Sequence, residues 1–226
     1  FGTNPQGSST QDPLLVRFSD QADAANWTAS ATTTAGDLRV GSGSRIIKAV
    51  ETKREILILT DTSLHSMRFI GAPFTFGLSE LSKGITVMGP NAITAVNDNV
   101  IWMGQDGFYS YGGQLSQLPC PIKDKIFGDF NTSQFDKVFA GVNSAFSEVF
   151  WFYPSSSSDD NDKYVVFNYG ENVWYYGDLA RRAWLDRGIR NLPFAVGGQY
   201  LFEHEKGYDD DGSPMTSFIE SNQIEP

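Results

Sequence analysis

A spaced repeat of short β-strand patterns constrains this chain more than any other feature. The stretch NVIWMGQDGFYSYGGQLSQL, residues 99–118, holds three short runs rich in aromatic and β-branched residues, separated by Gly104–Gly107 and by Gly112–Gly113. The runs are too short to be helices, and glycine tolerates the positive φ that tight turns require. The stretch therefore predicts an up-and-down meander of antiparallel strands.

Related stretches recur along the chain. The segment AITAVNDNVIWMGQDG, residues 92–107, aligns without a gap on LPFAVGGQYLFEHEKG, 100 positions later. Residues near 49–59 and 141–152 show the same order: a small residue and a valine, a polar turn, and an apolar run. The four marker valines, spaced by 46, 46 and 54 residues, are Val50, Val96, Val142 and Val196. A period of about 40–50 residues is typical of β-propeller blades.

Each repeat continues with further strand patterns. Third strands are expected at 63–69, 108–111 and 164–169, and fourth strands at 114–118 and 172–176. A single four-stranded sheet cannot bury both of its faces, so consecutive units must stack on one another. We therefore predict an all-β fold, a β-propeller-like array of four-stranded antiparallel blades. Both a complete and an incomplete propeller are compatible with this prediction. The expected organisation is a flexible N-terminal arm at 1–13 and one domain at 14–226, with units near 46–81, 91–118, 138–177 and 193–226.

Several segments between the strands have less regular patterns. The serine- and aspartate-rich segment 154–162 predicts a solvated, mobile loop, and 208–214 a similar excursion. The segments 131–139 and 179–188 could each contain a turn or two of helix. The sequence does not decide this, because neither segment has a long apolar stripe.

Composition excludes several classes of site. The net charge is −10, which disfavours gripping nucleic-acid phosphates by counterion release. The single Cys120 excludes an internal disulfide framework and a cysteine zinc site, and two histidines leave little scope for a multi-histidine metal centre. No apolar run is long enough to span a bilayer, and the start of the sequence does not resemble a signal peptide. No cofactor is predicted.

Two groups of acidic residues are candidates for metal binding or catalysis. The aspartates at 159, 160 and 162 and at 209–211 are clustered as calcium ligands are, but they lack the alternating spacing of a calcium loop, so solvated loops are predicted. Glu148, Glu203 and Glu205 suggest an alternative, a glycosidase in which two carboxylates flank the scissile bond. The tryptophans that would stack on sugar rings in that alternative are Trp102, Trp151, Trp174 and Trp184. Trp102 and Trp151 occupy equivalent repeat positions, which is typical of core packing.

The remaining patterns assign no catalytic residues. The segment GSGSR at 41–45 is neither a phosphate loop nor a nucleophile elbow, and no Ser-His-Asp grouping is assigned around His65 or His204. The only basic cluster consists of Arg181, Arg182, Arg187 and Arg190. These four arginines are the candidate contacts to a partner or to DNA. The alternative interpretation is that they belong to a solvated or salt-bridged loop.

Four segments together resemble a group of structural proteins from the tails of short-tailed bacteriophages, the tail hub, nozzle or packaged-DNA stabilisation proteins. They are VRFSDQADAANWT at 16–28, LTDTSLHSMRFIGAPFTF at 59–76, VIWMGQDGFYSYGGQLSQLPC at 100–120, and 148–177 from EVFWFYP to NDKYVVFNYGENVWYYG. They cover most of residues 14–205, and their motifs carry no chemistry.

The resemblance implies a structural virion protein without enzymatic activity. It implies a β-propeller within a ring, a hexamer of this chain, that extends the DNA channel and docks fibres and other tail or neck proteins. Double-stranded DNA would pass through transiently. The net charge of −10 suggests in addition that the lumen is acidic, which would let DNA slide. The alternatives that stay open are a carbohydrate-binding or glycoside-cleaving propeller, and a pair of all-β sandwiches with a protein-binding role.

Overall fold

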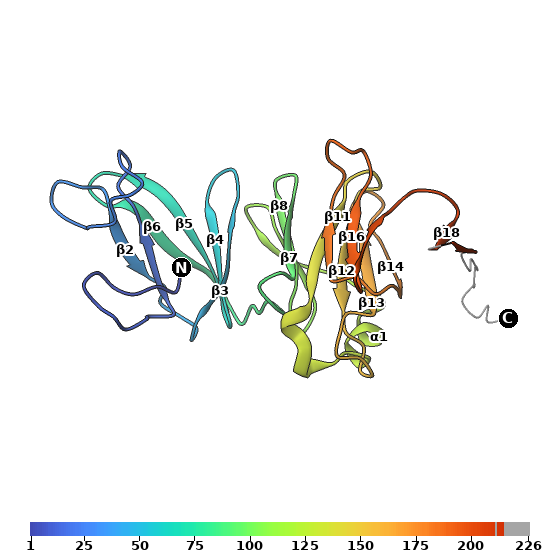
Figure 1. Ribbon diagram of the computed structural model, residues 1–226. Coiled ribbons are helices and arrows are strands. Elements are labelled where there is room, and N and C mark those ends of the chain that lie inside the picture. The colour runs from blue at the N-terminus through green and yellow to red at the C-terminus, as the bar shows by residue number, and fades with distance from the viewer. Residues whose placement is uncertain (211, 215–226) are drawn as a thin grey trace.

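The chain folds into a row of antiparallel β-sheets that succeed one another in the order of the sequence (Figure 1). The structure is a computed structural model that describes residues 1–210 and 212–214. Three consecutive sheets have four strands each, in the simple order of a meander. The predicted all-β, propeller-like array of four-stranded blades is thus confirmed.

The three four-stranded sheets contain twelve strands. The first sheet holds β3 (Ile46–Glu51), β4 (Ile56–Thr60), β5 (Ser63–Gly71) and β6 (Thr75–Lys83). The second holds β7 (Ile93–Val96), β8 (Asn99–Met103), β9 (Phe108–Tyr111) and β10 (Leu115–Leu118). The third holds β11 (Phe139–Asn143), β12 (Glu148–Tyr153), β13 (Lys163–Asn168) and β14 (Val173–Asp178).

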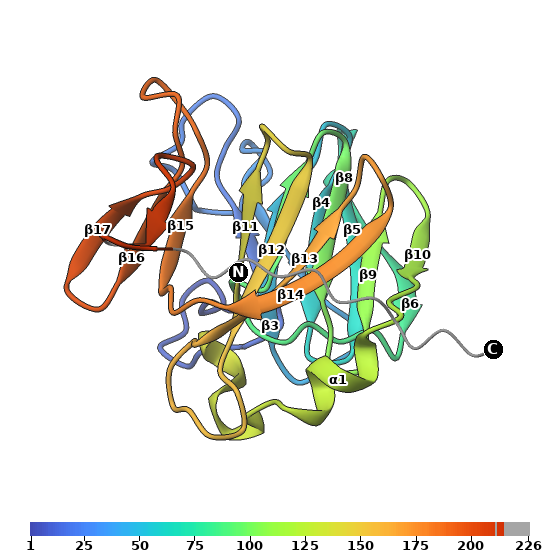
Figure 2. The ribbon, with the colours of Figure 1, turned by 90° about the vertical axis from the view of Figure 1, so that its right-hand side faces the viewer.

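Smaller sheets lie on either side of these three. At the N-terminal end, β1 (Leu15–Phe18) pairs with β2 (Gly36–Arg39). At the other end, β15 (Ala183–Leu185), β16 (Phe194–Gly197) and β17 (Tyr200–Glu203) form a three-stranded sheet, followed by the short pair β18 (Asp209–Asp210) and β19 (Ser213–Pro214). Figure 2 shows β15–β17 set apart from the stack of larger sheets.

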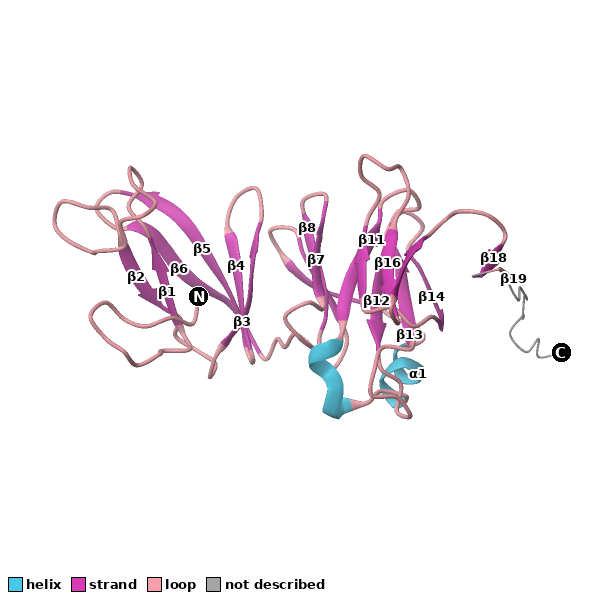
Figure 3. Ribbon diagram, in the orientation of Figure 1, coloured by secondary structure: helices cyan, strands magenta, loops and turns pink. Residues whose placement is uncertain are grey.

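Two short helical segments join the second and third four-stranded sheets (Figure 3). They are α1 (Lys123–Gly128) and the 3-10 helix η1 (Thr132–Lys137). The segment 131–139 therefore contains helical turns. The segment 179–188 does not, because Ala183–Leu185 pairs with β16 as a strand. The structure describes no helix that is both long and apolar enough to cross a membrane.

The alternation of side chains along each strand explains how the sheets stack. On β12, Val149, Trp151 and Tyr153 face the large core shared with the two preceding sheets. Phe150 and Phe152 belong to a separate cluster, with Trp184 packed against it. Because successive side chains of a strand point to opposite faces, one apolar strand supplies both neighbouring cores.

The first strands of three successive sheets, β7, β11 and β15, lie side by side. Asn91 and Phe139 form a parallel bridge between the starts of β7 and β11, and the amide of Ala140 donates a 2.7 Å hydrogen bond to the carbonyl of Asn91. Strand β11 in turn contacts β15. The first strands of these three sheets thus form a continuous row.

Three of the four marker valines occupy matching places. Val50, Val96 and Val142 lie on β3, β7 and β11, the first strands of their sheets. Val196 lies on β16, the second strand of its sheet, because β15 precedes it and pairs with it. The part of the expected unit 193–226 that falls at 211 and 215–226 is outside the described residues.

The segment 154–162 is more ordered than its composition predicted. Ser155 and Asn161 are buried, and the Asp162 carboxylate accepts hydrogen bonds from the amide and hydroxyl of Ser155, both at 2.7 Å. Asp160 pairs with Lys137 at 3.3 Å and with Arg182 at 2.8 Å. The prediction of a solvated loop was therefore wrong for Ser155 and Asn161, because the loop folds onto η1 and the segment before β15. Asp159 and Asp160 are exposed, as predicted.

Candidate functional site

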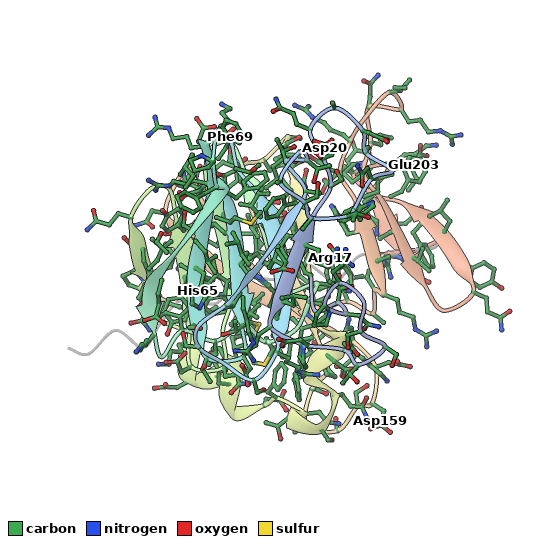
Figure 4. The ribbon with its side chains drawn as sticks, turned by 90° about the vertical axis from the view of Figure 1, so that its left-hand side faces the viewer. Arg17, Asp20, His65, Phe69, Asp159 and Glu203 are labelled. Atoms are coloured by element: carbon green, nitrogen blue, oxygen red, sulfur yellow. The ribbon has the colours of Figure 1, made fainter. Side chains whose placement is uncertain are left out.

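The two ends of the array present different surfaces. At the N-terminal end, Val16 packs inward, and the ring of Phe18 meets Phe76 edge-on at 4.9 Å. The opposite side of β1–β2 carries polar residues, with Asp37 and Arg39 exposed. Figure 4 looks onto this end, where Arg17 lies under the N-terminal loops. Polar side chains and loops thus cap the array here.

The arm at 1–13 takes part in this cap. The Gly2 amide donates a 2.7 Å hydrogen bond to the carbonyl of Leu15, and the Arg39 guanidinium pairs with Asp12 at 2.7 Å. The flexibility expected of the arm stays a prediction.

At the other end, the sheet β15–β17 has two different faces. Its inner face carries Trp184, which stacks on Phe150 at 5.1 Å and whose indole N–H donates to the Val142 carbonyl at 2.8 Å. Its outer face carries mainly apolar side chains, with Leu185 68% and Leu201 66% exposed, and Glu203 lies on the same face opposite Phe194. We define the terminal apolar face by Ala183, Leu185, Phe194, Val196 and Leu201.

The terminal apolar face is slightly hollowed. A depression of about 320 Å³ is lined by these residues and by Arg190. The Arg190 guanidinium lies 5.6 Å from the centre of the Phe194 ring, so it borders the face. Within the described residues, no further sheet covers this face.

The four arginines predicted as contacts do not form one patch. Arg181 is only 7% exposed; its guanidinium lies 4.3 Å from the Phe202 ring centre and donates a 2.9 Å hydrogen bond to His204. Arg182 is held by Asp160 in the ion pair described above. The Nε of Arg187 donates to the Ser144 hydroxyl at 3.2 Å. Arg181 therefore lies inside the fold. Among the other three arginines, Arg190 is the one that borders the terminal apolar face.

The structure brings two of the three glutamates together. The side-chain amide of Asn143 donates to Glu148 at 3.3 Å and to Glu205 at 3.1 Å. The Tyr175 hydroxyl also donates to Glu148. Glu203 points elsewhere and pairs with Lys206 at 2.5 Å. Sequence spacing could not show this convergence, because Glu205 comes from a different sheet.

Burial and a neighbouring charge shift the pKa of Glu148. Burial raises the pKa of Glu148, and the nearby carboxylate of Glu205 raises it further, while the hydrogen bonds from Tyr175 and Asn143 oppose the rise. The pKa of Glu148 is raised overall, which means that the site disfavours a negative charge on Glu148 next to Glu205.

The tryptophans expected to bind sugars in the glycosidase alternative pack against protein instead. Trp102 and Trp151 are buried, and their indole N–H groups donate to the carbonyls of Thr86 and Ala92, each at 3.0 Å. Trp174 stacks on Phe167 at 4.7 Å. These contacts are structural, as the equivalent repeat positions of Trp102 and Trp151 indicated.

A polar cluster around His65 is an association that the sequence did not reveal. His65 Nε2 lies 2.8 Å from the Ser63 hydroxyl and 3.3 Å from the Ser42 hydroxyl, which in turn donates to Glu80. Burial lowers the pKa of His65, and the charge of Glu80 partly offsets this. Both hydroxyls share one ring nitrogen, and Glu80 is reached through Ser42, so the arrangement differs from a Ser-His-acid triad.

Metal-binding groups are sparse. Across residues 1–210 and 212–214, no cluster of three or more histidine, cysteine, aspartate or glutamate side chains could hold a metal ion. Burial raises the pKa of Cys120 to about 11, which keeps its thiol protonated and weakly reactive at neutral pH.

Comparison with known proteins adds little. No protein-family model matches the chain, and no curated protein matches its sequence. Among solved structures, the crystal structure of Kluyvelomyces marxianus Hsv2 is similar with a TM-score of 0.48 and 11% sequence identity, over 92% of this chain and 61% of that chain. The chain therefore spans less than two thirds of the length of that protein chain, and a likeness of this size carries no argument about function.

Proposed function

We propose that this chain is a structural component of a bacteriophage tail, of the hub or nozzle type. In this role it forms part of a ring around the DNA channel, a hexamer of this chain, and provides a docking platform for fibres and other tail or neck proteins in the virion. It performs no catalysis. The four segments that resemble such tail proteins, described above, support the proposal.

The terminal apolar face is the single observation that carries a docking role. Leu185 and Leu201 would lose their exposed apolar area to a partner surface, at roughly 25 cal/mol per Å² buried. The N-terminal end, by contrast, is closed by polar residues and loops. The array can therefore be extended by burial of apolar surface at its β15–β17 end.

We commit to one occupant for this face, a β-sheet with its own apolar face contributed by a neighbouring subunit of the tail. Inside this molecule the same kind of contact already recurs: Leu57 of β4, Trp102 of β8 and Val149 of β12 belong to one core shared by three stacked sheets. A further sheet would continue this stacking.

The charge of the chain is compatible with a DNA conduit. The net charge is −10, and the candidate arginines are divided among an interior site, an ion pair and separate surface positions. A surface of this kind offers few phosphate contacts, so DNA could pass without being held.

Labelling and incorporation in intact particles test the proposal. An antibody against the purified chain should label the tails of virions whose genome encodes it, and label confined to the capsid or missing from virions would contradict the proposal. The double variant Leu185→Asp/Leu201→Asp should be lost from those particles while keeping the parental Tm when purified. Phe74→Asp is the matched control, because Phe74 is also strongly exposed, at 71%, and lies in the turn between β5 and β6, outside the terminal apolar face.

The carbohydrate alternative has less support, because the tryptophans are engaged in the interior and Glu148 and Glu205 share one amide donor. Binding of the chain to glycans, together with normal incorporation of the double variant, would favour this alternative over the tail function.

A further inference from the structure

The N-terminal cap, which we define as residues 1–40, rests on the first four-stranded sheet through a small core of its own. Leu14, Val16 and Val40 of the cap pack with Ile58 of β4 and Met67 of β5, in a cluster separate from the large core of the array. Proteins open locally where few apolar contacts hold a segment. The cap can therefore lift from the sheet while the large core stays closed.

The loop that follows the cap, residues 41–45, is fastened to the sheet by hydrogen bonds. The amide and the hydroxyl of Ser44 donate to the Asp61 carboxylate, at 2.7 and 2.6 Å. The carbonyl of Ser42 accepts a 3.2 Å hydrogen bond from the Ser63 hydroxyl. The hydroxyl of Ser42 lies 3.3 Å from Nε2 of His65. Because this loop leads from the cap into β3, a change that loosens the loop also loosens the cap.

His65 is the titratable group at the centre of this network, and it is only 2% exposed. Its neighbour on β4 is Ile58, and its neighbour on β6 is Glu80, which pairs with Lys83 at 3.6 Å. From the loop, the Ser42 hydroxyl donates to Glu80. A positive charge on His65 would thus be enclosed by the sheet and the loop, with the Glu80 carboxylate as the neighbouring charge.

The network responds to mild acid through this histidine. Burial lowers the pKa of His65 below its usual 6.5, and the charge of Glu80 offsets this only in part. The hydrogen bond from Ser42 lowers the pKa of Glu80. Burial would raise the pKa of Asp61, but the hydrogen bonds from Ser44 outweigh it and the pKa is lowered. Both carboxylates therefore stay ionised above about pH 5, whereas the stabilisation by a neutral His65 ring, present above about pH 6.5, is lost as the pH falls below it.

We propose that His65 is an acid-sensitive latch that keeps the N-terminal cap closed on the first four-stranded sheet. A neutral imidazole donates at one ring nitrogen and accepts at the other, whereas an imidazolium donates at both and carries a charge that burial disfavours. Protonation therefore favours the state in which the loop 41–45 has lifted and water reaches the ring. The cap then separates, and Ile58 and Met67 become accessible, so that mild acid gives the polar N-terminal end an apolar face.

Hydrogen exchange measured by NMR on the full chain tests the latch. The Ile46 amide of β3 donates to the Pro13 carbonyl of the cap at 3.0 Å, so its exchange reports separation of the cap. The backbone amide of Trp151 lies on β12, between β11 and β13, and reports opening of the large core. Between pH 7 and pH 5 the protection factor of the Ile46 amide should fall severalfold, while that of the Trp151 amide should change less.

Three variants assign the effect to His65. His65→Gln keeps a hydrogen-bonding side chain that does not titrate, so it should remove the fall in Ile46 protection. His204→Gln is the matched control and should keep the fall, because His204 is the other histidine of the chain and follows β17. Glu80→Gln should enlarge the fall and lower the pKa of His65 in the NMR titration, because it removes the charge that favours the imidazolium in the closed cap.

Two results would overturn the latch: a fall of the same size in His65→Gln and in the parent, or protection of the Ile46 amide that does not depend on pH. Should His65→Gln not fold, Glu80→Gln decides, and a fall no larger than that of the parent would overturn the latch as well. Because exchange is measured on the isolated chain, its outcome leaves the tail proposal unchanged, and the reverse also holds.

Discussion

The indole N–H of Trp151 donates a 3.0 Å hydrogen bond to the carbonyl oxygen of Ala92. Trp151 lies on β12, whereas Ala92 directly precedes β7 of the sheet before it. Trp184 repeats the relationship one sheet later, with the carbonyl of Val142 on β11. The indole ring of each tryptophan thus packs between two sheets and also joins them by a hydrogen bond.

Trp151→Ala should therefore destabilise the fold strongly. Removing a buried tryptophan ring leaves a cavity and costs about 3–5 kcal/mol. Urea unfolding followed by circular dichroism measures this loss. Trp27→Ala is the control, since Trp27 is 47% exposed, and it should cost less than about 1 kcal/mol. Equal losses in both variants would contradict the core role of Trp151.

Glu55→Gln should weaken the junction of the first two four-stranded sheets. The buried Glu55 carboxylate accepts hydrogen bonds from Ser66, from Arg68 Nε at 2.8 Å and from the Tyr111 hydroxyl at 2.7 Å. Glutamine keeps the shape but presents donors where acceptors are needed, at a cost of about 1–3 kcal/mol. Chemical denaturation at pH 7 gives the value.

The same residue makes stability depend on pH. Burial alone would raise the pKa of Glu55, but the hydrogen bonds from Arg68, Ser66 and Tyr111 outweigh it and hold the pKa below its usual value of 4.5. Its stabilisation is therefore present above about pH 4.5 and is lost as the pH falls through the lowered pKa. Glu55→Gln should flatten this part of the Tm profile, and a profile as steep as that of the parent would refute the assignment.

Gly141→Ala should disturb the junction between β11 and β15. A Cβ at position 141 would lie 2.7 Å from the Trp184 ring, so the indole must move. Overpacking of this kind costs about 1–3 kcal/mol, and tryptophan fluorescence should report the displacement. Gly128→Ala is the control, because no atom lies within 4 Å of its added Cβ, and it should be neutral or slightly stabilising.

Glu205→Gln should lower the pKa of Glu148. Burial raises this pKa first, and the Glu205 charge adds to the rise. Without that charge, the Glu148 carboxyl should titrate at a lower pH in carboxyl ¹³C NMR spectra. Glu203→Gln should leave the titration unchanged, and an identical effect of both variants would show that the two carboxylates do not interact specifically.

The chain should bind double-stranded DNA only weakly. With a net charge of −10 and its arginines dispersed, we expect a Kd above about 10⁻⁴ M at physiological salt, weaker than ordinary non-specific binding. Fluorescence anisotropy with a labelled duplex measures it. A micromolar Kd with a steep salt dependence would contradict the expectation that DNA slides past this protein.

Much of the fold follows from local sequence patterns. The glycine-rich breaks and β-branched runs at 99–118 encode the meander of β8, β9 and β10, because strand alternation and turn chemistry act over a few residues. The spacing of Val50, Val96 and Val142 likewise marked equivalent first strands. The local patterns failed where strand pairing involves residues farther apart in the sequence. Val196 resembles a valine of a first strand, but it lies on the second strand of its sheet, because β15 precedes β16 and pairs with it.

The sequence by itself determined that this chain is all-β, modular and acidic, since strand periodicity, turn residues and charge are properties of short segments and of composition. Only the tertiary structure decided that Glu148 and Glu205 converge on Asn143, that Arg181 is interior, and that one end of the array is polar and the other apolar. The physical reason is that these features depend on which faces of separate sheets meet, and residues far apart in the chain are brought together only by the burial of apolar surface as the sheets stack.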